Sequence, residues 1–456
     1  MALRRRFFMR GLALAATIAL LIVGVARSIG RADETESNKA ENSAVAAIQR
    51  LGGRVVRGGD GTSQVISVRL SYQTTNEDLV HLKSLPSLQT LDIVNARKVT
   101  DAGLAHLESL GNLRTLRLLE TGITGAGFQR LNSLKRLDLL VLSTADTTDA
   151  VISALAENGQ LHLLAFAAGP DGSRPRNDGQ VKALNLSYTR LTDAGLVAIR
   201  PLKNLQSLSL SGLPITDRGL NQLMVLTELK SLDLDGSQVT DAGLIRLTAF
   251  ARLEAINLGG TAITDKGVEL LGAVASLTAV GLGATKISDA GVASLQRLPG
   301  LTHLDLNTTA VGDSGLEALK PLGQITHLIL HNTRVTDAGM RHVKSLRNLQ
   351  ELVLWETAVT DVGLAQLSDH KKLRSLVLSG ERITDRGLRY LFRIVSLQTL
   401  VLNNTSVTAD GLAGLKGHPA LRSLFITYHR LTNKEIEELR KKLPNIVIRE
   451  QERISR

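Results

Sequence analysis

The chain has 456 residues, of which 43% are apolar, 3% are aromatic and none is cysteine. The lack of cysteine excludes disulfides, thiolate metal sites and a cysteine nucleophile, and the scarcity of aromatic residues means that any core is aliphatic. The net charge is +11, but residues 1–32 carry six arginines and no acid, which leaves +11 − 6 = +5 for the remainder. A nucleic-acid site needs a clustered basic stripe, with aromatic platforms for single strands. The sequence has neither, so we expect no nucleic-acid partner.

Residues 1–32 have the pattern of an export signal. Four arginines precede an uncharged apolar run over residues 11–26, which is shorter than the ~20 residues of a typical membrane-spanning helix. A basic segment before a short apolar stretch is typical of a signal peptide. Arg27, directly after the run, leaves an uncleaved signal anchor open. Both alternatives place the remainder outside the cytoplasm, in the periplasm, in the cell envelope or secreted. A membrane contact is expected only through this segment, if it stays uncleaved.

Two short segments follow. Residues 33–43 are polar and charged, which predicts a flexible spacer. Residues 44–64 open with apolar residues at helical spacing (Val45, Ile48 and Leu51). We expect this second segment to cap the N-terminal end of the structure that follows.

A 24-residue repeat occupies residues 65–431. Its period is marked by glycines at positions 103, 127, 195, 219, 243, 267, 291, 315, 339, 363, 387 and 411. Alternating leucines, as at Leu304 and Leu306, predict a short strand with one apolar face. A Thr-Asp pair before each glycine predicts a helix start, because its oxygens can cap free backbone N–H groups. One strand and one helix cannot bury their apolar faces alone, so the copies must stack. Residues 432–456, with a helical pattern over 434–443, are expected to cap the last repeat.

This repeat resembles those of the leucine-rich repeat family. Its Thr-Asp-x-Gly-Leu motif is similar to the 24-residue subtype of bacterial envelope leucine-rich proteins and F-box leucine-rich proteins. The resemblance implies an α/β fold: a leucine-rich-repeat solenoid with a curved parallel β-sheet on the concave side and helices on the convex side. Where the family often has Asn or Cys after the strand, this chain mostly has Thr, as at Thr261 and Thr285. A threonine hydroxyl can still satisfy backbone groups in that turn.

The 24-residue period is interrupted once, because Val151 and Gly195, which occupy equivalent repeat positions, are 44 residues apart. Leu161, Leu164 and Phe166 are expected to form one strand. The Gly- and Pro-containing residues 167–180 cannot be a helix, and we expect a loop that replaces one convex helix. That loop is either a tolerated solvent-facing segment or a docking site for a partner.

The sequence predicts no catalysis, no metal and no cofactor. Helix capping explains the recurrent aspartates, and we find no phosphate-binding loop, Ser-His-Asp arrangement or His-Glu-x-x-His motif. His303 and His327 occupy equivalent strand positions, with Asp305 and His331 on the same face. Such a group could hold zinc, but histidine is also an ordinary exposed strand residue, and we predict no metal site.

Residues between the two core leucines of each strand are expected to point outward. They are small or polar from Ser209 to Asp305 and then apolar in five successive repeats. A contiguous exposed apolar patch usually marks an interaction site, and tryptophan is enriched at binding hot spots. The strand preference of β-branched residues, or a C-terminal segment folded over Phe425, would be the other explanation. The predicted partner-binding residues, which include the only tryptophan, are Ile329, His331, Val353, Trp355, Val377, Val401 and Phe425.

These patterns predict a non-catalytic recognition protein. It would bind a protein partner, or alternatively a glycan, through the concave face of an exported solenoid. The resemblance also suggests a second function, the substrate-recognition adaptor of an SCF-type ubiquitin ligase. That function needs an F-box before the repeats, where this chain has an export signal, a spacer and one short helix. Compartment separates the two, because a ligase adaptor acts in the cytosol or nucleus.

Overall fold

The computed structural model describes residues 36, 38–59, 64–427 and 430–451. The predicted export signal, residues 1–32, lies outside the described residues, as do residues 33–35 and 37 of the predicted spacer. A helix runs over residues 38–50, so the later part of the segment expected to be a spacer is helical. No helix within the described part of the chain is long and apolar enough to cross a membrane.

The chain folds into two compact units, Met1–Asp146 with Leu163–Ala165, and Thr147–His162 with Phe166–Arg456. The first unit contains a five-stranded sheet in the order β1-β2-β3-β4-β5, in which only the β1–β2 pair is antiparallel. Its strands and helices are β1 (Arg54–Arg57), β2 (Val65–Leu70), η1 (Glu77–Ser84), β3 (Thr90–Val94), α2 (Asp101–Leu104), β4 (Thr115–Leu119), α3 (Gly125–Phe128), η2 (Gln129–Ser133) and β5 (Leu139–Leu142).

The second unit contains a 13-stranded sheet in sequence order from β6 to β18. Only the β6–β7 pair is antiparallel; every later neighbour is parallel. Its strands are β6 (Ala167–Ala168), β7 (Ala183–Asn185), β8 (Ser207–Ser209), β9 (Ser231–Asp233), β10 (Ala255–Asn257), β11 (Ala279–Gly281), β12 (His303–Asp305), β13 (His327–Ile329), β14 (Glu351–Leu354), β15 (Ser375–Ser379), β16 (Thr399–Asn403), β17 (Ser423–Thr427) and β18 (Val447–Gln451).

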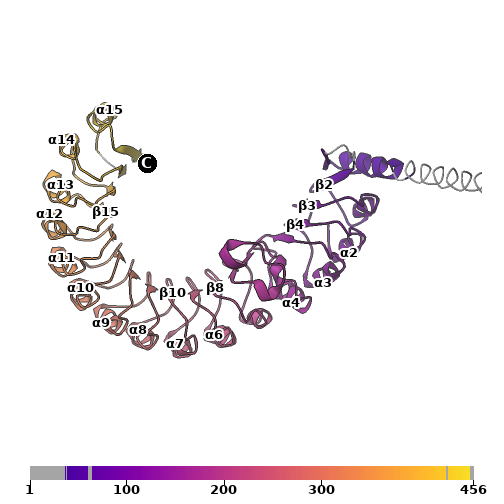
Figure 1. Ribbon diagram of the computed structural model, residues 1–456, viewed down its shortest axis with the longest axis horizontal. Helices are drawn as coiled ribbons and strands as arrows, with labels where there is room; N and C mark the ends of the chain where they lie inside the picture. Colours follow the sequence, from indigo (N-terminus) through magenta and orange to yellow (C-terminus); the bar gives the residue numbers. More distant parts are fainter. Residues whose placement is uncertain (1–35, 37, 60–63, 428–429, 452–456) are drawn as a thin grey trace, which may run out of the picture. The chain divides into compact units, whose positions relative to one another are not determined.

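Short helices connect these strands. Within the second unit, the strands line the inner side of an arc and the helices line its outer side (Figure 1), which is the arrangement of a leucine-rich-repeat solenoid. The helices are α4 (Asp149–Glu157), α5 (Leu196–Ile199), α6 (Asp217–Leu223), α7 (Asp241–Leu244), α8 (Asp265–Leu271), α9 (Asp289–Ser294), α10 (Asp313–Ala318), α11 (Asp337–Val343), α12 (Asp361–Leu364), α13 (Asp385–Leu391), α14 (Ala409–Ala413) and α15 (Asn433–Lys442), and 3₁₀ turns lie at η6 (Ile245–Ala249), η7 (Leu295–Arg297) and η8 (Ala365–Leu367).

The core is a stack of leucines between the sheet and the helices. In β12, Leu304 and the following Leu306 are buried, whereas Asp305 between them faces outward and is half-buried. Each fully buried leucine stabilises the fold by about 1.5–3 kcal/mol relative to an exposed one. The pairing joins Leu304 to Leu328 in the next repeat. The predicted register, with leucines inward and the residue between them outward, is therefore confirmed.

A ladder of aspartates links each repeat to the next. Thr240 is the N-cap of α7, and its Oγ1 accepts a hydrogen bond from the N–H of Ala242. Asp241, the first helical residue, reaches forward: Oδ1 accepts from the N–H of Thr264 at 2.9 Å and Oδ2 from its hydroxyl at 2.6 Å. The predicted capping is thus correct for the threonine. The aspartate, which was expected to cap its own helix, instead fixes the cap of the following one.

Where a threonine follows the strand, as in most repeats, it closes the turn, as predicted. The hydroxyl of Thr261 donates to the carbonyl of Leu258 at 2.6 Å, and Thr285 donates to Leu282 at the same distance. One residue earlier the backbone is left-handed in successive repeats, with φ of +63° at Gly260 and +53° at Ala284. The chain therefore reverses direction with its polar groups satisfied.

The interruption differs in part from what the sequence predicts. A 3₁₀ turn, η3 (Leu161–Leu163), replaces the first part of the strand expected through Leu161, Leu164 and Phe166. The segment expected to be a loop contains β6 and two further 3₁₀ turns, η4 (Pro170–Gly172) and η5 (Asp178–Gln180). Backbone hydrogen bonds between β6 and β7 explain this difference, because they give the segment a sheet partner.

Candidate binding surface on the concave sheet

Three outward positions recur in each repeat of the second unit between β8 and β17. In β12 they are His303, Asp305 and Asn307, and we call the corresponding rows the first, second and third rows. Strand pairing aligns the first two rows, for example His303 with His327 and Asp305 with Ile329. Because neighbouring strands are about 4.8 Å apart, side chains of one row lie side by side along the sheet.

Five members of the second row are apolar and form what we call the apolar stripe. Parallel pairing from β13 to β17 places them next to one another. All five side chains are half-buried, while the leucines that flank them, with Ile426 after the last, face the core. The sheet thus brings together the five predicted residues Ile329, Val353, Val377, Val401 and Phe425.

The two other predicted site residues form an aromatic pair beside the stripe, in the third row. The rings of His331 and Trp355 stack with centroids 4.5 Å apart and planes 24° from parallel. Nδ1 of His331 lies 3.2 Å from the carbonyl oxygen of Trp355, and Nε2 lies 4.0 Å from Glu356. Trp355 remains 38% exposed. One indole face is therefore held by the imidazole, and the ring remains accessible to a partner.

The C-terminal end of the stripe meets the last strand. β18 pairs with β17 and places Arg449 beside Phe425. The guanidinium carbon lies 5.4 Å from the centre of the phenyl ring, which is within the range of a cation–π contact. Strand β18 thus borders Phe425, whose side chain is half-buried by the described residues.

The other half of the sheet face is polar and hollowed. An open groove of about 360 Å³ runs from β9 to β14, with Ala255, Ala279 and Gly281 among its lining residues. Asp233, Asp305 and Ile329 also line it, so the groove adjoins the first residue of the apolar stripe. The groove is open because Ala255, Ala279 and Gly281 are smaller than the residues at the equivalent positions of later repeats, such as His327 and Ile329.

Polar side chains in this half satisfy one another. Ser209 donates to Asp233 at 2.8 Å, and Asn307 donates to Asp305 at 2.8 Å. Ser211 donates to Asp235 at 3.4 Å. Burial and the neighbouring carboxylate of Asp233 raise the pKa of Asp235 above its usual value, against that hydrogen bond from Ser211. The carboxylate of Asp235 is therefore repelled by that of Asp233, which lines the groove.

Two stacked imidazoles mark the boundary between the polar and apolar halves. The rings of His303 and His327 lie 4.1 Å apart and 10° from parallel. Burial, and then repulsion from His327, lower the pKa of His303, which favours a neutral ring. Within the described ranges no group of three or more His, Asp or Glu side chains is placed to hold a metal ion. Among the described residues, His303 and His327 therefore lack a third side chain placed to complete a zinc site.

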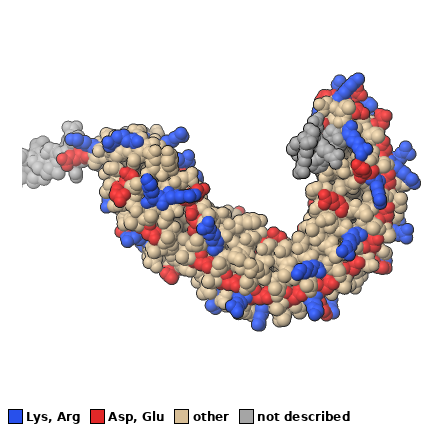
Figure 2. All heavy atoms as spheres, turned by 180° about the vertical axis from the view of Figure 1, so that it is seen from behind, with Lys and Arg blue, Asp and Glu red and all other residues tan. Residues whose placement is uncertain are grey.

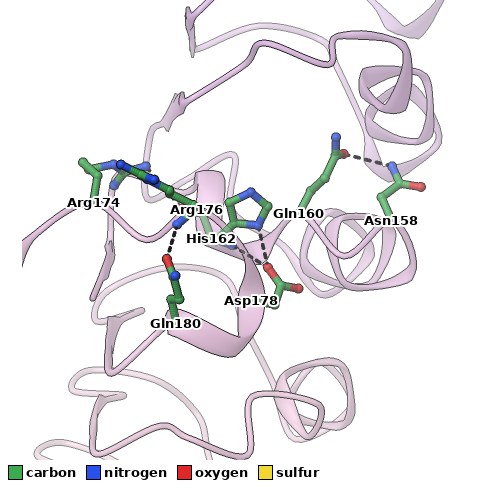
Figure 3. A network of polar contacts seen from close by, with 7 residues as sticks. All are labelled: Asn158, Gln160, His162, Arg174, Arg176, Asp178 and Gln180. Carbon is green, nitrogen blue, oxygen red and sulfur yellow. Dashed lines mark hydrogen bonds and ion pairs between the residues drawn. The ribbon is translucent and has the colours of Figure 1, made fainter. Parts of the chain in front are cut away.

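The interruption holds a polar network that sequence reasoning missed (Figure 3). Oδ1 of Asp178, in η5, accepts from the backbone N–H of His162 at 2.8 Å and lies 2.8 Å from Nδ1 of the same residue. The guanidinium of Arg174 donates to the carbonyls of Ala167 and His162, and the side chain of Gln180 accepts from the N–H of Arg176. His162 and Asp178 both lie where the sequence departs from the 24-residue repeat, and this departure is the sequence feature that could have singled them out. The network holds the segment in place.

Charges are mixed elsewhere on the second unit. On the face that Figure 2 shows, Lys and Arg side chains lie interspersed with Asp and Glu side chains. Several are paired between neighbouring repeats, such as Arg252 with Glu228 and Lys344 with Asp369 at 3.8 Å. The concave rows thus differ in character from this mixed surface.

Comparison with known proteins supports the repeat assignment. The family model described as "Leucine Rich repeat" matches residues 181–199, 225–247, 253–272 and 299–320. No curated protein matches the sequence. Every matched segment lies within the repeat array of the second unit.

The chain is also similar to several solved structures. An internalin from Listeria monocytogenes has 21% identity over 74% of this chain and 94% of its own, with a TM-score of 0.46. A leucine-rich-repeat protein from Leptospira interrogans has 19% identity over 81% and 91%, with a TM-score of 0.49. The ectodomain of a plant membrane receptor kinase from Arabidopsis thaliana, solved in complex with Casparian strip integrity factor 2, has 16% identity over 82% and 52%, with a TM-score of 0.42. The family match and the strand–turn–helix repeats described above together show that this chain contains leucine-rich repeats with the fold of a leucine-rich-repeat solenoid.

Proposed function

We propose that this protein is a non-catalytic recognition protein, exported from the cytoplasm, that binds a protein partner through the concave sheet of its second unit. Leucine-rich repeats typically serve as protein-binding scaffolds. The observation that supports this site best is the apolar stripe, since five half-exposed apolar side chains lie in register on a sheet face. Core packing does not account for them, because the buried leucine or isoleucine residues on either side of each supply the core.

The aromatic pair supports the same surface. A partner that covers the stripe would also bury Trp355, whose large ring contributes strongly to binding when water is excluded from it. The stack on His331 restricts the rotation of the indole before binding, so less side-chain entropy is lost on association. Export is supported only by the basic and apolar pattern of residues 1–32.

Affinity capture from the native envelope fraction tests the binding site. The test variant combines Trp355→Ala with Val377→Asp, and the control is Val362→Asp. Val362 is 60% exposed on helix α12, so the control introduces the same charge on the outer side of the unit. Far-ultraviolet circular dichroism should confirm that all three proteins are folded.

A partner captured by the wild type and the control, but lost by the double variant, is the expected result. Equal capture by all three proteins would contradict the assignment of this surface. Export is tested separately, by fusing residues 1–43 to a reporter enzyme that is active only outside the cytoplasm. An inactive fusion would contradict export without affecting the binding site.

A further inference from the structure

The chemistry of the partner can be inferred from the charges of the sheet face. In the described stretch from β8 to β17, the three outward rows contain no Lys or Arg, although the chain as a whole has a net charge of +11. The same rows contain the four carboxylates of Asp233, Asp235, Asp305 and Glu351. These rows are therefore negative on a positively charged protein, and the carboxylates gather on the polar side of the apolar stripe, whereas Arg449 of β18 borders its far end at Phe425.

The first unit shows that this distribution is not a general property of the repeat. In its sheet, the equivalent positions include Arg69, Asp92 and Arg117, which pairing places side by side. Arg69 and Arg117 approach the carboxylate of Asp92 to 3.0 and 3.7 Å. Acids on that sheet are thus neutralised within the protein.

No such neutralisation is seen for the carboxylates in the groove. Among the described residues, no ion pair is found for Asp233, Asp235 or Asp305, whose partners are hydroxyl, amide and backbone groups. Lys230 lies in the sequence directly before Ser231, the first-row residue of the strand that carries Asp233. Its ammonium group is paired with Glu254 at 3.6 Å. Burial, and then repulsion from Asp233, raise the pKa of Asp235, and no ion pair within the described part of the chain offsets that repulsion.

Geometry connects this negative region to the stripe. Asp233, Asp305 and Ile329 line the same groove, so a bound segment can run from one region to the other. The centre of the stripe is at β15, and the middle of the acidic region is between β9 and β12. The distance between these two points along the sheet is about 22 Å, at ~4.8 Å per strand. An extended polypeptide covers that distance with about seven residues.

We propose that the partner presents a polypeptide segment with an apolar row and, about seven residues away, a group of Lys or Arg side chains. The apolar row covers Ile329 to Phe425 and contacts Trp355. The basic side chains enter the groove, where they pair with Asp233 and Asp305, and reach Asp235 in the neighbouring third row. This inference rests on the proposed function, and it specifies the charge and the order of the ligand.

Synthetic peptides of about twelve residues test it, because a spacer of about three residues keeps the centres of the apolar and basic groups about seven residues apart. Two of them have five apolar residues, a short Gly-Ser spacer and four Lys or Arg residues, in the two opposite orders along the chain. A third replaces the basic residues by Glu, and a fourth replaces the apolar residues by Ser. Trp355 is the only tryptophan of the protein, so its fluorescence reports binding at the stripe directly, and calorimetry gives an independent affinity.

The matched variant changes Asp233, Asp235 and Asp305 together to Asn, which removes the charges but keeps the size of each side chain and one oxygen that can accept a hydrogen bond. At least one basic–apolar peptide should bind the wild type, shift the Trp355 emission and bind less tightly as salt increases. The triple variant should bind it about tenfold more weakly, as expected for the loss of several partly exposed ion pairs. The acidic and the serine-substituted peptides should bind more weakly still.

Equal affinity for the basic and acidic peptides, or an unchanged affinity of the triple variant, would overturn the inference while leaving the stripe as a binding surface. Failure of both basic–apolar peptides to bind at millimolar concentration would overturn it as well. The proposed function is judged separately by the capture experiment, in which the Trp355→Ala, Val377→Asp variant can lose a partner of any charge. The two failures are therefore distinguishable.

Discussion

The carboxylate of Asp241 occupies the space that a side chain at Gly267 would need. An ideal Cβ at position 267 would lie 2.3 Å from Oδ1 of Asp241, and the same approach recurs between Asp217 and Gly243. The two most regular residues of the repeat thus act together. The aspartate reaches forward to fix the next helix cap, and the glycine of that next helix leaves room for it.

Replacing this glycine should therefore be costly. We expect Gly267→Ala to lower the free energy of unfolding by about 1–3 kcal/mol, because the new methyl group must displace a carboxylate that holds two hydrogen bonds. Urea unfolding followed by circular dichroism measures the change. Gly323→Ala is the control, since nothing lies within 4 Å of a Cβ at position 323. An equal loss in both variants would show that the contact with Asp241 is not the cause.

A double-mutant cycle tests the coupling itself. Asp241→Ala should cost about 1–3 kcal/mol, because the N–H and hydroxyl of Thr264 lose their acceptor. In the Asp241→Ala background the nearest obstacle to a Cβ at position 267 is gone and only the apolar side chains of Ile263 and Leu244 remain, at 2.8 and 3.1 Å, so adding Gly267→Ala should cost less than it does in the wild type. The difference between the two costs is the interaction energy of the pair. Additive effects would mean that the two residues act independently.

The sequence is sufficient for the part of the structure that the 24-residue period determines. The buried positions of Leu304 and Leu306, the outward position of Asp305 and the alignment of the apolar stripe all follow from the alternation of strand residues. The forward reach of Asp241 does not follow, because local capping and a bond to the next repeat require the same residue types at the same spacing. Only the placement of neighbouring repeats distinguishes them.

Features outside the period were the ones missed. The His162–Asp178 pair lies in the segment where the repeat lengthens, so no other copy indicates its geometry. His370 and His418 stand where the preceding repeats have apolar residues such as Leu346, and both are buried. An isolated exception in a repeat is therefore a useful signal, but its contacts become clear only in three dimensions.

Backbone strain in the turns gives a third prediction. Thr308 is exposed and has a φ of +53°, whereas Gly236 occupies the equivalent position three repeats earlier with a φ of +67°. A β-branched residue pays about 1–2 kcal/mol for the left-handed region, and glycine loses about 0.5–1 kcal/mol of extra entropy on folding. We expect Thr308→Gly to stabilise the protein by about 0.5–1 kcal/mol and the reverse change, Gly236→Thr, to destabilise it. Thermal unfolding of both variants measures this, and stabilisation by Gly236→Thr would contradict the argument.

A fourth prediction concerns the buried imidazole of His370, which is 1% exposed. Its Nδ1 lies 3.3 Å from the carbonyl of Leu367 and its Nε2 lies 3.2 Å from that of Val343. A neutral ring can donate to only one of these carbonyls. Burial nevertheless lowers the pKa of His370, outweighing the two carbonyls, which raise it.

This lowered pKa makes stability depend on pH in a definite direction. Below a pH of about 6.5 the unfolded chain protonates this histidine while the folded chain keeps it neutral. The unfolded state then binds more protons, so the free energy of unfolding falls as the pH decreases toward the lower folded pKa. Above about 6.5 both states are neutral, and the contribution is fully present.

His370→Leu should therefore flatten the pH dependence of stability below about pH 6.5. Leucine is the residue at the equivalent position 346, so the core should accept it, and at pH 7.5 the variant should be at least as stable as the wild type. The pKa of His418 is also lowered by burial. A double variant, His370→Leu with His418→Leu, should therefore flatten the pH dependence of stability further than the single variant does. Urea midpoints measured between pH 7.5 and pH 5 give both slopes. If the single variant keeps the slope of the wild type, protonation of His370 is not what couples folding to pH.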